Sequence, residues 1–535
     1  MALSSANTLR PYTGSFGPAE AKHLLRRATI GGATRANVER SVDLGLAATV
    51  DELLKPYTLG EPVTHVDDHP DLALGQSWIG VPEREDVAEG WRRPSLHAWV
   101  VDTYLSSGFS VHGRMWFFWI NHFGVDTTSP PHEGYAYYAK LHEHVTGNFR
   151  DLIADVTVNW KMLRFLNGNR NSVSAPNENF ARELLELFTV GKGPQRAEGD
   201  YTNYTEDDVR EFARALTGWK VRGAYTPDGT PQSTTYFSAR HHDTGDKQLS
   251  AAFGDAIITD GGESEYLTVV DTILAQPRSL DYLCRKFYRW FIDYDIDATD
   301  EETVVRPLAD AMRATGFDIR ATLRLLLQSE AFFDPAHRGA LAKSPVDFVA
   351  DMLLGFGGDI PARSDVKRRY GLMNSAKGEL KAQGIDVEIP DSVAGYKPFH
   401  QEPKFNRYWI NSGSLNNRSR FADKLISRQG LPLGQGVQPR FKLDLLGYID
   451  TFANPYDPND LIAELADRHL PLPMPYEQIS VLKQYLIPDL PDWEWTVEYG
   501  LYRSDPDDEG QRSAVASRVQ DVWRAMCDAA EFAFY

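Results

Sequence analysis

Residues 174–219 carry the feature that most constrains the fold, which is two successive runs of apolar residues at helical spacing. The apolar positions of the first run are Phe180, Ala181, Leu184, Leu187 and Phe188. They recur at i, i+1, i+4, i+7 and i+8, so they share one face of an α-helix. Ser174 is a suitable N-cap for this helix, Pro176 suits its first turn, and Gly191 ends it.

The second run predicts another helix, and its start is marked in the sequence. Thr205 and Asp208 have the spacing of a capping box, in which each side chain bonds the backbone of the other residue. Val209, Phe212 and Leu216 then form a buried stripe, and Gly218 ends the helix.

Helical spacing recurs along most of the chain, and sustained alternation of apolar and polar residues is absent. We therefore expect a mainly α protein, a large multi-helix bundle-like domain with a minor β/loop insertion near 220–262. A Gly- and Pro-rich stretch predicts a linker at 428–440. The expected domains are a helical core at 1–427 and a helical C-terminal extension at 441–535 that packs on the core.

Composition excludes several classes of protein. The net charge of −19 argues against nonspecific nucleic-acid binding. Only two cysteines occur, so a cysteine-rich zinc site is excluded. No P-loop or GxGxxG motif follows a strand, so no nucleotide cofactor is expected. No apolar run is long enough to span a membrane, and the N-terminus has no apolar leader. The sequence as given therefore predicts a cytoplasmic protein, or an exported one if a leader has been removed.

The central stretch resembles a known family. It reads PNENFARELLELFTVG and then YTEDDVREFARALTGW, which resembles the hallmark of a bacterial family known as domain of unknown function 1800. Further matching pieces, in the same order as in the family, are AKHLLRRATIGG, MWFFWINHFGV, HHDTGDK, LCRKFYRWFI, KSPVDFV and WINSGSLNNRSRFADKL. The resemblance covers roughly residues 15–427. It implies a fold but no settled reaction. Many relatives look exported, and relatives often lie beside a sulfatase-like family in genomes, which implies a possible sulfatase-like partner protein.

The polar side of the first central helix has two interpretations. Glu178, Arg182 and Glu186 are spaced by four residues, which is typical of ion pairs on a solvated helical face. Alternatively, the carboxylates include metal ligands or an acid–base group. Glu183 is the strongest candidate, because it lies where the polar arc meets the apolar face.

Two histidine motifs that match the family extend the second interpretation. His122 ends an aromatic-rich helix in the NHF motif, where a hydrogen-bonded core histidine is the alternative. His242 and Asp243 form a compact polar motif, for which a hairpin tip is the alternative. Histidines with carboxylates are the ligand set of Zn²⁺, Fe²⁺ or Mn²⁺. We therefore predict a divalent-metal site at which His122, Glu183, His242 and Asp243 converge in one pocket, with Glu183, Asp243 and Lys247 in catalytic roles.

Basic residues in motifs that match the family suggest the kind of substrate. They are Arg27, Arg182, Arg214 and Lys286. Such side chains complement a small anionic molecule. The sequence thus favours a metal-dependent, hydrolase-like enzyme acting on an anionic or polar substrate. One alternative is a non-haem metal oxidoreductase. The other is a non-catalytic scaffold or assembly partner, in which the same residues form a buried polar network.

Overall fold

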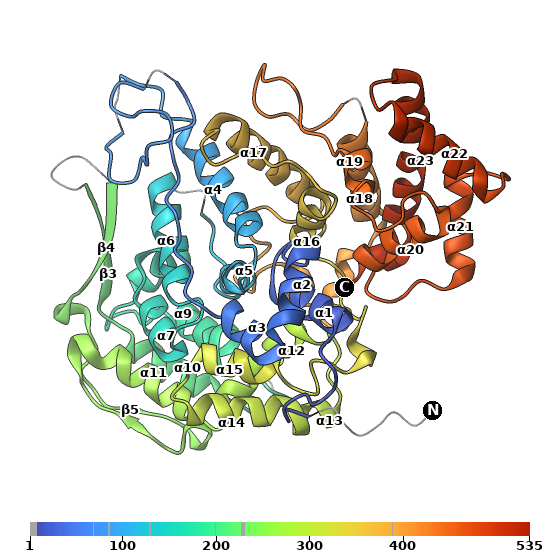
Figure 1. The fold of residues 1–535 in the computed structure, drawn as a ribbon. Helices are drawn as coiled ribbons and strands as arrows, with labels where there is room; N and C mark the ends of the chain where they lie inside the picture. Colours follow the sequence, from blue (N-terminus) through green and yellow to red (C-terminus); the bar gives the residue numbers. More distant parts are fainter. Residues whose placement is uncertain are drawn as a thin grey trace.

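The computed structural model of the protein describes residues 8–67, 69–83, 86–127, 130–197, 200–225, 231–387, 389–427 and 429–535. This part of the chain is mainly α-helical, as predicted, and its strands are short (Figure 1). Residue 428, the first of the predicted linker, lies outside the described residues.

The helices of the first 220 residues gather around one buried helix, α5 (Figure 1). They are α1 (Pro18–Ala28), α2 (Arg35–Leu44), α3 (Leu46–Leu53), α4 (Arg92–Ser106), α5 (His112–His122), α6 (Pro131–Glu143), α7 (Phe149–Thr157), α8 (Trp160–Phe165), α9 (Glu178–Glu183) and α10 (Glu206–Ala215). Every residue of α5 is buried. Burial on all sides is expected of a helix that carries aromatic and aliphatic residues around its whole circumference.

A second group of helices completes the core. It comprises α11 (Glu265–Ala275), α12 (Ser279–Phe291), α13 (Ala298–Asp300), α14 (Arg306–Ala314), α15 (Ile319–Leu327), α16 (Pro345–Ala350), α17 (Val366–Ala382) and α18 (Ser412–Ile426). Helix α12 packs on α5 through aromatic rings. The ring centroid of Phe118 is 5.1 Å from that of Phe287 and 5.2 Å from that of Trp290. These contacts fix the position of the remaining side chains of α12 beside the end of α5.

The strands of the described residues form three antiparallel hairpins. They pair β1 (Gln195–Ala197) with β2 (Asp200–Tyr201), β3 (Trp219–Tyr225) with β4 (Pro231–Phe237), and β5 (Lys247–Gln248) with β6 (Ile257–Ile258). The β3–β4 hairpin stands alongside α6 (Figure 1). The last two hairpins account for the predicted β/loop insertion near 220–262. Lys247 lies opposite Ile258 in the β5–β6 register, so this hairpin folds the chain back on itself.

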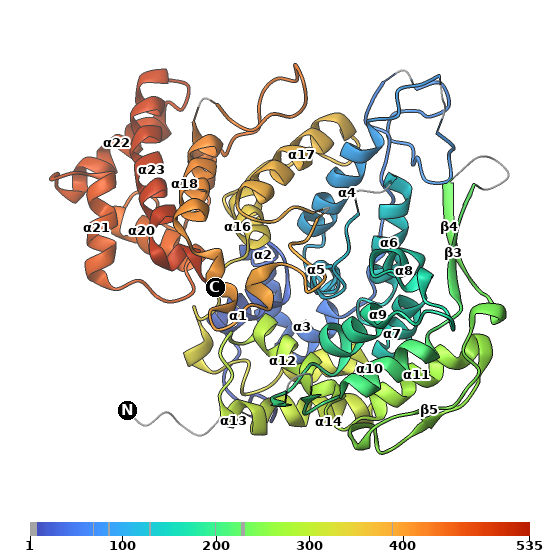
Figure 2. The same cartoon turned by 180° about the vertical axis from the view of Figure 1, so that it is seen from behind.

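The C-terminal helices lie to one side of the molecule, and the view from behind shows the same arrangement (Figure 2). They are α19 (Leu445–Ile449), α20 (Pro458–His469), α21 (Tyr476–Leu486), α22 (Asp492–Ser504) and α23 (Glu509–Asp528). The chain end returns to the core, where the Tyr535 backbone N–H donates to the Leu341 carbonyl at 3.0 Å. In the stretch predicted as a linker, Leu431 and Leu433 are buried. None of the helices described here has the length and apolarity that crossing a bilayer requires.

The first central helix differs from the expectation at both ends. Its N-cap is Asn177 rather than Ser174, because the Asn177 backbone N–H is held by the Asn171 side chain at 2.9 Å. The Asn177 side chain in turn accepts the Asn179 N–H. From Leu184 the helix continues as a π-helical turn, Leu184–Thr189. This wider turn changes the side-chain spacing.

The charged residues of this helix show the effect of the π-helical turn. Arg182 pairs with Glu178 at 3.3 Å, as the spacing predicts. Its other partner is Glu206 on α10, at 2.5 Å, whereas Glu186 pairs with Lys192 at 2.6 Å. The predicted pair between Arg182 and Glu186 is thus replaced by a bridge between α9 and α10.

Helix α10 begins as predicted. Thr205 Oγ1 accepts the Asp208 N–H at 3.2 Å, and the Asp208 carboxylate accepts the Thr205 N–H at 2.8 Å. Val209, Phe212 and Leu216 are buried. The local signals of this helix therefore suffice to place it.

Candidate functional site

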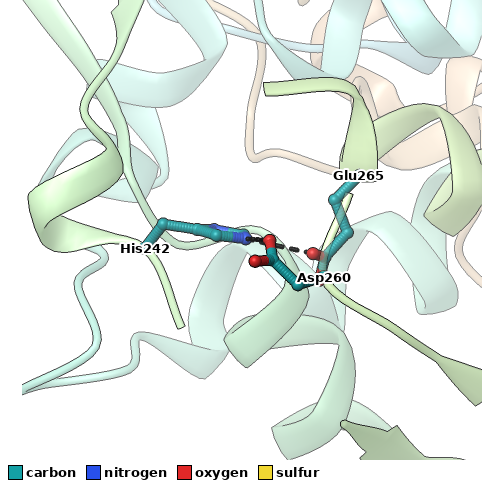
Figure 3. A group of neighbouring side chains, drawn as sticks. All are labelled: His242, Asp260 and Glu265. Atoms are coloured by element: carbon teal, nitrogen blue, oxygen red, sulfur yellow. Dashed lines mark hydrogen bonds and ion pairs between the residues drawn. The ribbon is translucent and has the colours of Figure 1, made fainter. Parts of the chain in front are cut away.

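Three side chains converge beside the β5–β6 hairpin. His242 follows β4 and a short helical turn, Asp260 lies in the loop after β6, and Glu265 begins α11 (Figure 3). His242 Nε2 lies 3.0 Å from Glu265 Oε2 and 3.5 Å from Asp260 Oδ1. Across the described residues, this is the one group of three or more His, Cys, Asp or Glu side chains whose ligand atoms all lie within 4.8 Å of one another.

The His242 ring faces oxygen acceptors at both nitrogen atoms. Nδ1 lies 2.9 Å from the Thr217 carbonyl oxygen, and Nε2 lies against the Glu265 carboxylate. A neutral imidazole has only one N–H, so it can donate to one of these acceptors. A second proton on the ring or a cation between Nε2 and the carboxylates would satisfy the second contact, whereas a neutral ring protonated at Nε2 would leave Nδ1 to the Thr217 hydroxyl, 3.3 Å away.

Glu265 is the buried centre of the group. Its side chain is 1% exposed, and its Oε2 also accepts the Gly261 backbone N–H at 2.9 Å. Its other oxygen, Oε1, lies 2.6 Å from Nζ of Lys247, whose side chain is fully buried. Lys247 also donates to the Asp243 carbonyl oxygen at 2.5 Å. Lys247, predicted to be catalytic, thus holds Glu265 in place in this structure.

The Asp243 carboxylate turns to an arginine. Arg214 of α10 donates to both of its oxygens, from Nε at 2.8 Å and from Nη2 at 3.2 Å. These hydrogen bonds lower the pKa of Asp243, because they stabilise the ionised form. The backbone of Asp243 also accepts from Lys247, so this residue links the Arg214 pair to the Glu265 group.

His122 has a different set of partners. Its Nε2 donates to the Phe188 carbonyl at 3.1 Å, and its Nδ1 accepts from Lys286 Nζ at 3.0 Å. Burial and the positive charge of Lys286 lower the pKa of His122 well below its usual value. The ring is therefore a neutral, fully bonded core histidine, which was the alternative interpretation of the NHF motif.

Glu183 is half-buried on α9 and has no hydrogen bond or ion pair with the residues that the structure describes. Burial and the nearby Glu186 raise its pKa. Glu183 is not among the residues whose ligand atoms converge with His242.

The structure brings only one of the four predicted metal ligands into the converging group. Only His242 belongs to the converging group, where its companions are Asp260 and Glu265. Asp243 adjoins the group but is held by Arg214, and His122 and Glu183 are outside it. Asp260 and Glu265 were missed because they lie 18 and 23 residues beyond His242. One available signal was that Glu265 is spaced by four and eight residues from the buried Val269 and Ile273, so its carboxylate lies on the apolar face of α11.

The basic residues predicted to bind substrate have mixed surroundings. Arg182 and Arg214 are each held by two carboxylates. Arg27 is fully buried, donates to the His337 carbonyl, and has a pKa lowered to about 10 by burial. Lys286 is partly buried and has no carboxylate oxygen within 4.0 Å among the described residues. Lys286 is thus the one of the four that is both accessible and without a carboxylate partner.

A large cavity in the described part of the chain lies elsewhere. It measures about 630 Å³ and lies between the N-terminal helices α1 and α2 and the C-terminal helix α20. Lys22, Arg26 and Arg468 line it, but each is engaged by a carboxylate or a backbone carbonyl. No residue of the His242 group lines this cavity.

Comparison with known proteins places the chain in a family. No curated protein and no solved structure matches it. A family model described as "Protein of unknown function (DUF1800)" matches residues 23–494. The match covers most of the chain and runs past residue 427 into the predicted C-terminal extension. The chain therefore belongs to the DUF1800 family of proteins of unknown function.

Proposed function

We propose that the protein is a metal-dependent, hydrolase-like enzyme that acts on an anionic or polar substrate, with a divalent cation held by His242, Asp260 and Glu265. One observation carries the proposal. The ligand atoms of these three residues lie within 4.8 Å of one another, and both ring nitrogens of His242 face oxygen acceptors.

The donor set suits a divalent cation. One imidazole nitrogen and two carboxylates are ligands used by Zn²⁺, Fe²⁺ and Mn²⁺. With its proton on Nδ1, His242 donates a hydrogen bond to the Thr217 carbonyl, and Nε2 is then the nitrogen available for a metal. Such a partner for the second ring nitrogen is the usual feature of metal-binding histidines.

Access to the group comes through Asp260. Its side chain is 44% exposed, whereas those of His242 and Glu265 are 2% and 1% exposed. A cation held there would thus have a buried side, fixed by α11, and a side open to solvent. When bound, such a cation lowers the pKa of a coordinated water and so supplies the nucleophile of a hydrolysis.

The metal content of the purified protein tests the proposal. After exposure to Zn²⁺, Fe²⁺ or Mn²⁺ and removal of excess metal, one of them should remain at about one equivalent by mass spectrometry. His242→Ala and Glu265→Gln should each lower that stoichiometry while preserving the helical spectrum. His241→Ala is the matched control, because the neighbouring ring bonds Ser238 Oγ and faces no carboxylate among the described residues. Loss of metal in the control as well, or no retained metal in the wild type, would overturn the proposal. Retained Fe²⁺ with oxygen consumption would favour the oxidoreductase alternative.

A scaffold without catalysis is the second candidate, and the Lys247 contact favours it. The Lys247 ammonium already neutralises one charge of the Glu265 carboxylate. If His242 carries two protons, the group is a complete buried network that fixes the β5–β6 hairpin to α11. In that case His242→Ala destabilises the protein, and the wild type retains no metal.

A further inference from the structure

A small pocket lies between α5, α12 and the segment around 398–406. It has a volume of about 20 Å³, and we call it the Lys286 pocket. The polar residues that line it are Asn121, His122, Lys286, Arg289 and Asn406. Aromatic rings make up most of the remaining wall, so the polar groups face a space with few competing partners.

Two cations of this pocket have no carboxylate within 4.0 Å in the described ranges. Lys286 Nζ donates to His122 Nδ1 and to the Leu187 carbonyl at 3.4 Å. Arg289 donates from Nε to the Tyr294 carbonyl at 3.3 Å, and its guanidinium lies 4.1 Å from the ring centroid of Phe405. All of these partners are neutral. Two positive charges on one turn of α12 are thus left without a negative partner in contact.

The acid–base properties of these residues agree with an excess of positive charge. Burial and the charge of Arg289 lower the pKa of Lys286 to about 7. Burial and the charge of Arg285 lower the pKa of Arg289, and Glu402, which lies beyond ion-pair distance, opposes that effect. A bound anion would relieve the repulsion between the two cations.

Buried polar atoms without partners provide an independent observation. Trp290 and Asn406 line the pocket and are 6% and 7% exposed. The indole N–H of Trp290 and the side-chain oxygen of Asn406 have no hydrogen-bond partner among the described residues. Buried polar groups are nearly always bonded, so a missing partner points to an unseen one. An indole N–H can only donate, and the Asn406 amide can rotate to donate as well, so both suit an acceptor ligand.

We propose that the Lys286 pocket binds the carboxylate group of a small ligand, between the Lys286 ammonium and the Arg289 guanidinium. A free volume of about 20 Å³ holds roughly one water-sized group, so one carboxylate oxygen occupies it and the rest of the ligand lies toward the outside. Carboxylates are favoured over larger oxyanions by this size, and a guanidinium binds them with two parallel hydrogen bonds. The site does not use any ligand of the proposed metal and stands independently of it.

Formate, the smallest carboxylate, is the probe. Calorimetric titration at constant ionic strength should show saturable formate binding to the wild type, with sulfate binding more weakly. Lys286→Met and Arg289→Met should each weaken formate binding at least tenfold. Lys220→Met is the matched control, because Lys220 also lacks a carboxylate partner among the described residues but donates to the Asn169 and Asn171 carbonyls. Its formate affinity should equal that of the wild type.

A second measurement needs no variant. Acetic anhydride at pH 7.5 should modify Lys286 quickly, and formate should slow this reaction because a bound anion favours the protonated amine. Lys220 in the same digest reports any general effect of formate. Absence of saturable formate binding, equal binding by Lys286→Met, or no protection of Lys286 would each overturn the proposal. The metal content of Lys286→Met should equal that of the wild type, so failure here is distinguishable from failure of the metal site.

Discussion

Replacing Lys286 by Met should stabilise the protein at acidic pH, and the size of the effect follows from the buried charge. The pKa of Lys286 falls from its ordinary 10.5 to about 7 in the folded state. Each pKa unit corresponds to about 1.4 kcal/mol, so burying the protonated amine lowers the free energy of unfolding of the wild type by about 5 kcal/mol. Met removes that cost.

The substitution also has a cost of its own. It leaves Nδ1 of His122 without its donor, and an unsatisfied buried acceptor costs about 1–3 kcal/mol. The net gain at pH 6 is therefore about 2–4 kcal/mol. With an unfolding entropy of about 2.1 cal/mol/K per residue, 535 residues give about 1.1 kcal/mol/K. The expected rise in Tm is then about 2–4 °C.

The pH dependence separates this reasoning from a simple packing effect. Between pH 7 and 10.5 the unfolded chain binds a proton at Lys286 that the folded protein does not, so wild-type stability rises with pH in this window. The advantage of the Met variant should therefore shrink by about 3 kcal/mol, or about 3 °C, between pH 6 and pH 9.5. Thermal melts of both proteins at these two pH values, in a buffer without carboxylates, provide the measurement. An advantage that stays constant with pH would refute the lowered pKa.

Two further predictions concern the core. Arg114→Met should destabilise the protein by about 3–5 kcal/mol, because it leaves Asp347 buried and without its ion pair at 2.6 Å. Arg150→Met is the control: it removes an exposed pair with Asp271 and should cost about 1 kcal/mol or less. Equal shifts in Tm for the two variants would contradict this prediction. Thr205→Ala should lower the free energy of unfolding by about 1 kcal/mol. It should also speed hydrogen exchange at the Asp208 amide, because it removes the acceptor of that N–H. An unchanged exchange rate there would contradict the capping box.

The sequence predicted the start of a helix correctly where the capping residues lie close together in the sequence. The capping box at the start of α10 consists of Thr205 and Asp208, and both of its bonds are present. The start of α9 depends on Asn171, which is six residues before the cap and in the preceding loop. Helical periodicity carries no information about that contact, so Ser174 was the expected cap and Asn177 is the observed one.

The candidate site was predictable only in part, because its residues are brought together by a hairpin. The β5–β6 pairing sets Lys247 opposite Ile258 and so carries the His242 segment to the start of α11. Strands of two residues are too short for an alternation of apolar and polar residues to be recognised in the sequence. His242 and Asp243 could be selected by their motif, whereas Glu265 could be selected only as a carboxylate on an apolar face.

The two functional hypotheses differ in the protonation of His242, as the total charge of the His242 group shows. With a neutral His242, the charges of Lys247, Glu265 and Asp260 sum to −1, and one contact between Nε2 and a carboxylate lacks a hydrogen. A divalent cation supplies both the missing charge and the missing contact. With a doubly protonated His242 the sum is zero and both ring nitrogens donate a hydrogen bond, so nothing remains for a metal to compensate. The protonation of one ring thus distinguishes a metal centre from a structural network. In a metal centre Asp260 would be the ligand on the solvent side, whereas the structural network needs only His242, Glu265 and Lys247.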